Sequence, residues 1–184
     1  KKKGVNVLGI GDTPYDQLQH EVRESLTEYY FVPSLADYDQ MLRAVAFFTF
    51  KYGRIDWIES NNEYWLASDA HLRTDFNVRT GWQMGDMEHI KNKSAMKPYY
   101  HKAGIPTARL TKVTTLAAAE EFLAEVGYPV IVKPDVGAGA MDTYRIDNAD
   151  ELRHFYASKP AIPYVIEEFV TGDICSYDAI VDAD

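Results

Sequence analysis

The sequence predicts an α/β protein in two parts, a parallel sheet flanked by helices and then an α+β unit. In the first half, short apolar runs at residues 5–10, 29–32 and 55–58 alternate with amphipathic stretches at helical spacing. In the second half, the segments over residues 108–168 follow the order β-α-β-β-α-β. A chain of 184 residues with 46% hydrophobic and 26% charged residues is long enough for two small domains.

The first part is predicted to have the order β-α-β-α-β. Thr13 can cap a helix whose first residue is Pro14, with Asp16 completing a capping box. A second helix over residues 37–52 carries an apolar stripe and is expected to end at Gly53. Because ligands of parallel sheets bind beyond the carboxyl ends of the strands, the loops GIGDTP and ESNNE occupy ligand-facing positions.

Neither of these loops identifies a ligand. The dinucleotide fingerprint needs a third glycine at residue 14, where this chain has proline, so an NAD site is excluded. Asp12 and Glu59 are interpreted as caps of turns and helices rather than as substrate ligands.

The second part begins after the sequence RTGWQMG at residues 79–85, which interrupts the alternation of strands and helices. Asp86 is predicted to cap a new helix, and Pro98 is expected to kink or restart that helix. Asn148 and Glu151 form a capping box for the last helix. The order β-α-β-β-α-β hosts many unrelated functions, so the fold alone does not decide the function.

Composition excludes several classes of protein. With 28 acidic and 19 basic residues, the net charge of −9 disfavours a nucleic-acid partner. An RNA-recognition module would need exposed aromatic and basic residues on its central strands, and VIVKP and TYRI supply only one lysine, one arginine and one tyrosine. The histidines lack the spacing of metal ligands, so no metal site is predicted. The single cysteine, Cys175, and the absence of a membrane-length apolar run predict a cytoplasmic protein without a membrane partner.

The stretch VIVKPDVGAGAMDTYRI, residues 130–146, is the strongest candidate for a ligand site. Side chains alternate along a strand, so Ile131 and Lys133 share one face and the two valines share the other. Gly137 and Gly139 would let backbone N–H groups approach an anion such as a phosphate chain. The alternative is a β-hairpin with a glycine turn and a lysine that extends to solvent.

Three motifs in order resemble the ATP-grasp superfamily of carboxylate–amine ligases: NKSAM, then VIVKP with its glycine loop, then IEEFVTGDICSYD. That superfamily includes biotin carboxylase, carbamoyl phosphate synthetase and D-alanine–D-alanine ligase. The resemblance implies a Rossmann-like pre-ATP-grasp domain at residues 1–85 and a helical connection at 86–106. It further implies the ATP-grasp lid subdomain at 107–168 and the start of a C-terminal subdomain at 169–184.

The same resemblance implies where ATP binds. Lys133 and Lys93 would face its phosphates, the glycine loop at residues 135–141 would cover the β- and γ-phosphates, and Asp173 would hold the ribose. The hinge at residues 167–170 would hydrogen-bond adenine through its second glutamate and its last backbone group. The cofactor-binding residues implied by the resemblance are Lys93, Lys133, Gly137, Ala138, Gly139, Glu167, Glu168, Val170 and Asp173.

The function implied is an ATP-dependent carboxylate–amine, or thiol, ligase that acts through an acyl phosphate. Magnesium ligands and the catalytic arginine would lie beyond Asp184, so no catalytic or metal-binding residue is expected in this chain, which is predicted to be an N-terminal part that is inactive alone. The expected partners are ATP, a carboxylate and an amine, and the sequence names neither substrate nor the oligomeric state. Two alternatives remain, a non-catalytic module that binds a nucleotide or anion for regulation, and an interaction scaffold without a ligand.

Overall fold

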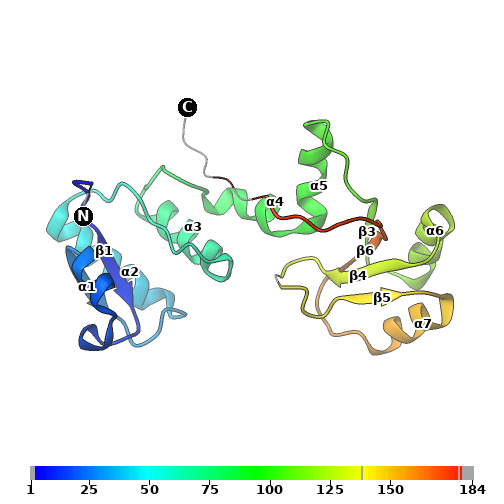
Figure 1. Cartoon of the computed structure of the whole chain (residues 1–184), viewed down its shortest axis with the longest axis horizontal. Helices are drawn as coiled ribbons and strands as arrows, with labels where there is room; N and C mark the ends of the chain where they lie inside the picture. The colour runs from blue at the N-terminus through cyan, green and yellow to red at the C-terminus, as the bar shows by residue number, and fades with distance from the viewer. Residues whose placement is uncertain (1–2, 138, 178, 180–184) are drawn as a thin grey trace. The chain divides into compact units, whose positions relative to one another are not determined.

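The computed structural model describes residues 3–137, 139–177 and 179, and its helices and strands form the mixed α/β fold that the sequence predicts (Figure 1). The chain divides after Met87 into two compact units, Lys1–Met87 and Glu88–Asp184. The described part of the first unit contains a parallel sheet and that of the second an antiparallel sheet, which confirms the predicted fold class. No helix in the described part of the chain is both long and apolar enough to cross a membrane.

The first unit is built on two parallel strands covered by a long helix. The helix carries the buried residues Ala44, Val45 and Phe48, begins at Asp37, whose carboxylate accepts the N–H of Gln40 at 3.2 Å, and ends before Gly53 as predicted. The elements of this unit are β1 (Leu8–Gly11), α1 (His20–Ser25), β2 (Glu28–Phe31), α2 (Tyr38–Tyr52) and α3 (Leu66–Asp75), with 3₁₀ turns at Tyr15–Gln17, Glu63–Trp65 and Met84–Asp86.

The predicted third strand at residues 55–58 is wrong. This segment carries no strand pairing, and in the described part of the unit β1 pairs only with β2. Side chains bind the backbone of the segment instead, because the hydroxyl of Thr80 donates to the carbonyl of Asp56 and the guanidinium of Arg73 donates to the carbonyl of Ile58 at 2.9 Å and 2.5 Å. An apolar run of strand length therefore remains an irregular connection without strand pairing.

The predicted first helix is also wrong in its start. The chain forms a 3₁₀ turn at Tyr15–Gln17, becomes extended at Leu18, and only then enters α1. The residue that caps the turn is Pro14, and no side-chain hydrogen bond caps it, so the predicted capping box is not formed. The carbonyl of Thr13 accepts the hydroxyl of Tyr29 at 2.6 Å, which ties this loop to β2.

The second unit is a four-stranded antiparallel sheet with two helices on one face (Figure 1). Its strand order is β3-β6-β4-β5. The buried side chains of β4 pack against α6 and α7, and the predicted alternation along β4 is confirmed. The elements of this unit, with the short helix that leads into it, are α4 (Met87–Lys91), α5 (Lys93–Lys102), β3 (Leu110–Lys112), α6 (Leu116–Val126), β4 (Val130–Pro134), β5 (Tyr144–Ile146), α7 (Ala149–Ser158) and β6 (Tyr164–Glu168).

The helix predicted from Asp86 is interrupted at Asn92 rather than at Pro98. Helix α5 starts where its first amides find acceptors, because the N–H of Lys93 donates to the carbonyl of Asp135 at 2.9 Å. Pro98 lies inside α5, and the helix continues past it to Lys102. The contact with the end of β4 therefore decides where this helix begins, and the proline that should have broken it does not.

The last helix keeps its predicted cap. The side-chain oxygen of Asn148 accepts the N–H groups of Asp150 at 3.1 Å and of Glu151 at 3.0 Å, and the carboxylate of Glu151 accepts the side-chain amide of Asn148 at 2.7 Å. The backbone N–H that Glu151 accepts is that of Asp147, one residue before the position of the usual capping box.

Candidate functional site

The face of the second sheet opposite its helices gathers the charged residues that the sequence singles out. Strand pairing places Ile131 of β4 opposite Glu167 of β6 on one side and opposite Arg145 of β5 on the other. Paired residues of neighbouring antiparallel strands point to the same face, and so do residues two apart on one strand. Lys133 and Glu167 therefore share this face, which we call the open face, while Val130 and Val132 lie in the core.

Glu167 lies between two lysines on the open face. Its Oε1 is 2.5 Å from the Nζ of Lys97 on α5, and its Oε2 accepts a hydrogen bond from the Nζ of Lys133. Burial opposes the ionisation of Glu167, but the hydrogen bonds from Lys133 and Lys97 outweigh it and hold the pKa of this carboxyl below its ordinary value. The three groups carry one negative and two positive charges, so the cluster has excess positive charge for an anion.

Lys93 and its neighbour Ser94 fasten α5 to the end of β4. The Nζ of Lys93 donates to the carbonyl of Gly137 at 2.9 Å. Asp135, whose exposed fraction is 3%, accepts the N–H of Ser94 at 2.8 Å and its hydroxyl at 2.7 Å. The start of α5 and the start of the glycine loop are therefore held together by at least three hydrogen bonds between polar groups.

The glycine loop adopts positive backbone φ angles, which glycine tolerates better than other residues. Gly137 has φ of 149° and Gly139 has φ of 69°, and both values fall where side chains are strained. Ala140 and Asp142 also have positive φ, at 57° and 53°, without being glycine. The predicted site residue Ala138 lies outside the described residues.

The two glutamates that end β6, Glu167 and Glu168, lie on opposite faces of the sheet. Glu168 pairs with Arg109, whose Nε lies 2.5 Å from its Oε2, and this hydrogen bond lowers the pKa of Glu168. The side chain that shares a face with Lys133 is thus Glu167. Val170, with an exposed fraction of 66%, and Asp173 follow as exposed irregular chain.

The sequence analysis missed Lys97 and Arg109, and it placed Asp135 in the glycine loop without foreseeing that this residue anchors α5. Lys97 stands four residues after Lys93, a spacing that puts both on one face of a helix, so helical periodicity could have found it. Asp135 directly follows the strand, but no local signal shows that it is buried. The partner of Arg109 is 59 residues away, and such a pair is not visible in sequence.

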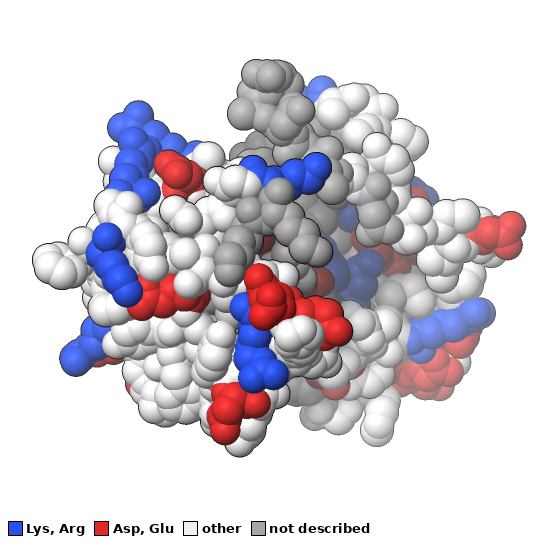
Figure 2. All heavy atoms as spheres, turned by 60° about the vertical axis from the view of Figure 1, so that its left-hand side comes forward, with Lys and Arg blue, Asp and Glu red and all other residues white. Residues whose placement is uncertain are grey.

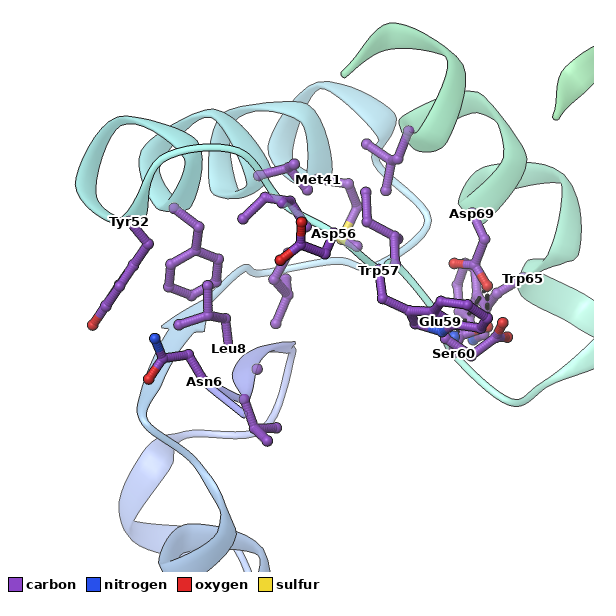
Figure 3. Close-up of a pocket in the computed structure, with 18 of the residues that line it drawn as sticks. Asn6, Leu8, Met41, Tyr52, Asp56, Trp57, Glu59, Ser60, Trp65 and Asp69 are labelled. Carbon is purple, nitrogen blue, oxygen red and sulfur yellow. Dashed lines mark hydrogen bonds between the residues drawn. The ribbon is translucent and has the colours of Figure 1, made fainter. Parts of the chain in front are cut away.

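A separate cavity of about 970 Å³ lies within the first unit, next to β1 and the irregular segment at residues 55–58 (Figure 3). Two of its acidic lining residues are engaged. Asp69 accepts the hydroxyl of Ser60 at 2.6 Å, and Glu59 pairs with Arg73 at 2.9 Å. The remaining walls are mixed, with apolar side chains such as Leu8 and Met41 beside polar ones such as Asn6 and Asp56, and this lining does not identify a ligand.

Charge and possible metal ligands add no other candidate. Figure 2 shows basic and acidic side chains interspersed over the face that it draws, without an extended area of one sign among the described residues. Within the described ranges, no group of three or more His, Cys, Asp or Glu side chains could hold a metal ion.

Residues 92–165 match the family model described as "Carbamoyl-phosphate synthase L chain, ATP binding domain". This segment contains the start of α5, the glycine loop and most of the four-stranded sheet. Among curated proteins, the L-arginine-specific L-amino acid ligase of Bacillus subtilis is 33% identical over 111 residues, which make up 59% of this chain and 26% of that protein.

Solved structures share the fold. An L-amino acid ligase from Bacillus licheniformis matches with a TM-score of 0.64 at 20% identity, covering 93% of this chain and 40% of that one. The biotin carboxylase domain of Hydrogenobacter thermophilus 2-oxoglutarate carboxylase, solved with MgADP, ADP and bicarbonate, matches with a TM-score of 0.72 at 18% identity, covering 92% and 40%. The chain spans about a quarter of the curated relative's length.

Proposed function

We propose that this chain, whose residues 92–165 match the carbamoyl-phosphate synthase ATP-binding domain model, is an ATP-grasp protein and part of an ATP-dependent carboxylate–amine, or thiol, ligase. The observation that carries the proposal is the open face, where Lys133 lies beside a glycine loop with positive backbone φ angles. A lysine and free backbone amides are the groups that bind a polyphosphate.

In the proposed complex, ATP binds on the open face of the second unit. Lys133 neutralises phosphate charge, and the loop amides at Gly137 and Gly139 approach the phosphate chain. Lys93 holds the start of this loop through the carbonyl of Gly137. Adenine and ribose lie along the hinge at residues 167–173, so the nucleotide is oriented by the end of β6.

The chemistry proposed for the whole protein is transfer of the γ-phosphoryl group to a substrate carboxylate oxygen, with release of ADP. The amine nitrogen, or a thiol, then attacks the acyl carbon, and inorganic phosphate leaves. The residues described here contribute positioning and charge neutralisation to this reaction, and none of them acts as an acid or base. Among the described residues, no group of three or more His, Cys, Asp or Glu side chains could hold magnesium, so its ligands are proposed to belong to the rest of the protein.

The substrate class proposed is an α-amino acid. The curated relative named as an L-arginine-specific L-amino acid ligase is 33% identical to this chain over 111 residues. An amino acid carries both groups that the reaction needs, a carboxylate to be activated and an amine to attack. The partners proposed are thus ATP and amino acids, in the cytoplasm, without nucleic acid.

The experiment measures ATP binding and ADP release by the full-length protein with pairs of amino acids. Lys133→Ala should weaken ATP binding by about 10- to 100-fold, the effect of losing one charge-assisted hydrogen bond. The matched control is Lys159→Ala, at the end of α7 beyond the opposite face of the sheet. Unchanged binding in Lys133→Ala would contradict the assignment of the site.

The alternative function is separated by the same measurement. Saturable ATP binding with no ADP release for any pair of amino acids would support a non-catalytic module that binds a nucleotide for regulation. ADP release that depends on an added carboxylate and amine would support the ligase.

A further inference from the structure

Lys97 is the residue of the open face to which neither the sequence motifs nor the proposed reaction gives a role. Its Nζ lies 2.5 Å from the Oε1 of Glu167 and also donates to the carbonyl of Ala108. Only 13% of its side chain is exposed, against 24% for Lys133. Lys97 is therefore the deeper and more firmly held of the two lysines that share Glu167.

The arrangement poses an electrostatic problem for any anion that binds Lys133. The ammonium group of Lys133 is bound to Glu167, so it must leave or share that carboxylate to meet a phosphate. If Lys133 were the one cation on Glu167, its departure would leave a carboxylate of 13% exposure without a counter-charge. Such a carboxylate is strongly destabilised, because it is too buried for water to solvate it. With one lysine alone, Glu167 would compete directly with the nucleotide.

Lys97 removes this competition. Because Lys97 contacts Oε1 and Lys133 contacts Oε2, a departure of Lys133 would leave Glu167 with one cation still bound. Its second bond, to the carbonyl of Ala108, keeps it from following Lys133 toward the ligand. Since Lys97 arises from α5 and Lys133 from β4, the two cations approach the carboxylate from different elements.

We propose that Lys97 is a positioning residue for nucleotide binding, which holds Glu167 so that the ammonium of Lys133 is released to the phosphates. This inference rests on the proposed function, because it takes a polyphosphate as the ligand of Lys133. Lys97 itself touches Glu167 and the backbone and not the nucleotide.

The test measures the affinity of the full-length protein for a non-hydrolysable ATP analogue and, separately, for adenosine. Lys97→Met should weaken binding of the ATP analogue by about tenfold. In this variant Lys133 is the one lysine left on Glu167, so the carboxylate competes with the phosphates for it. Adenosine, which has no phosphate, should bind Lys97→Met as it binds the unaltered protein. Lys97→Arg retains the charge and should restore most of the affinity for the analogue.

A double variant distinguishes positioning from a general structural defect. In Glu167→Gln the neutral amide has no charge to compete with a phosphate for Lys133, so adding Lys97→Met to it should cause little further loss of affinity. Equal loss for adenosine and the ATP analogue, an additive double variant, or unchanged binding in Lys97→Met would each overturn the inference. Lys133→Ala separates the inference from the proposed function. If Lys133→Ala weakens binding of the ATP analogue and Lys97→Met does not, the inference alone fails. Unchanged binding in Lys133→Ala refutes both the proposed function and the inference.

Discussion

At the scale of single residues, Glu167 dominates the electrostatics of the open face. It is the one carboxylate that links α5 to β4 through two lysines among the described residues. Burial raises the free energy of its ionised form, and the two lysines lower it by more. The charge state of this residue therefore contributes to the stability of the second unit as well as to the proposed binding of phosphate.

The depressed pKa of Glu167 predicts a contribution to stability that depends on pH. The ionised form is favoured by folding, so the contribution is complete above the unfolded-state pKa and is lost as pH falls through the lower folded-state pKa. Glu167→Gln should therefore lose less stability than the unaltered protein on acidification from about pH 5 to about pH 3. Urea denaturation at a series of pH values measures this, with Glu120→Gln, at an exposed position of α6, as the control. Parallel acid curves for Glu167→Gln and the unaltered protein would refute the prediction.

The pair of Asp135 and Ser94 predicts a coupled loss of stability. Asp135→Ala leaves the half-buried N–H and hydroxyl of Ser94 without their acceptor and should cost about 1–3 kcal/mol of unfolding free energy. Ser94→Ala removes only the hydroxyl and should cost about 0.5–1.5 kcal/mol. Because the two changes remove the same bond, the double variant should lose less than the sum of the single losses. Chemical denaturation of the four proteins gives the coupling energy, and strict additivity is the outcome that contradicts it.

At the scale of elements, tertiary partners decide which apolar runs become strands. Strand β4 pairs with β6 along its whole length and with β5 over Val130–Val132. Residues 55–58 are equally apolar, but their carbonyls are bound by Thr80 and Arg73. The difference lies in what satisfies the backbone rather than in the pattern of side chains.

The N-cap of α7 predicts a stability change confined to one element. Asn148→Ala removes the acceptor of two backbone N–H groups and should destabilise the second unit by about 0.5–2 kcal/mol. Asn148→Ser keeps a side-chain oxygen and should recover most of that loss. Thermal or urea unfolding of both variants makes the comparison, and a serine variant as unstable as the alanine variant would argue against capping as the cause.

At the scale of the whole molecule, the two units have cores made of different residues. The core of the second unit joins Leu152 and Phe155 of α7 to Val132 and Ile166 of the sheet, and each of its buried members belongs to that unit. The first unit buries residues of its own, Phe48 and Leu72 among them. Each unit thus has its own hydrophobic contribution to stability.

Separate cores predict separate responses to cavity-forming substitutions. Leu152→Ala should cost about 2–5 kcal/mol in the second unit, and Leu72→Ala a similar amount in the first. Amide hydrogen exchange should show reduced protection in β4 and α7 for Leu152→Ala and in α2 for Leu72→Ala. Equal loss of protection in both units from either substitution would show that they unfold as one.

The sequence by itself determined the order of elements in the second unit, the sided burial of β4 and the cap of α7, because periodicity and capping depend on residues close together in the chain. Only the tertiary structure decided that residues 55–58 stay unpaired, that α5 starts at Lys93, and that Glu167 rather than Glu168 meets Lys133. These outcomes rest on partners tens of residues apart, as with Lys133 and Glu167, which are separated by 34 positions. Local sequence patterns do not predict such pairs, because the two side chains become buried and neutralise each other only when the folded chain brings them into contact.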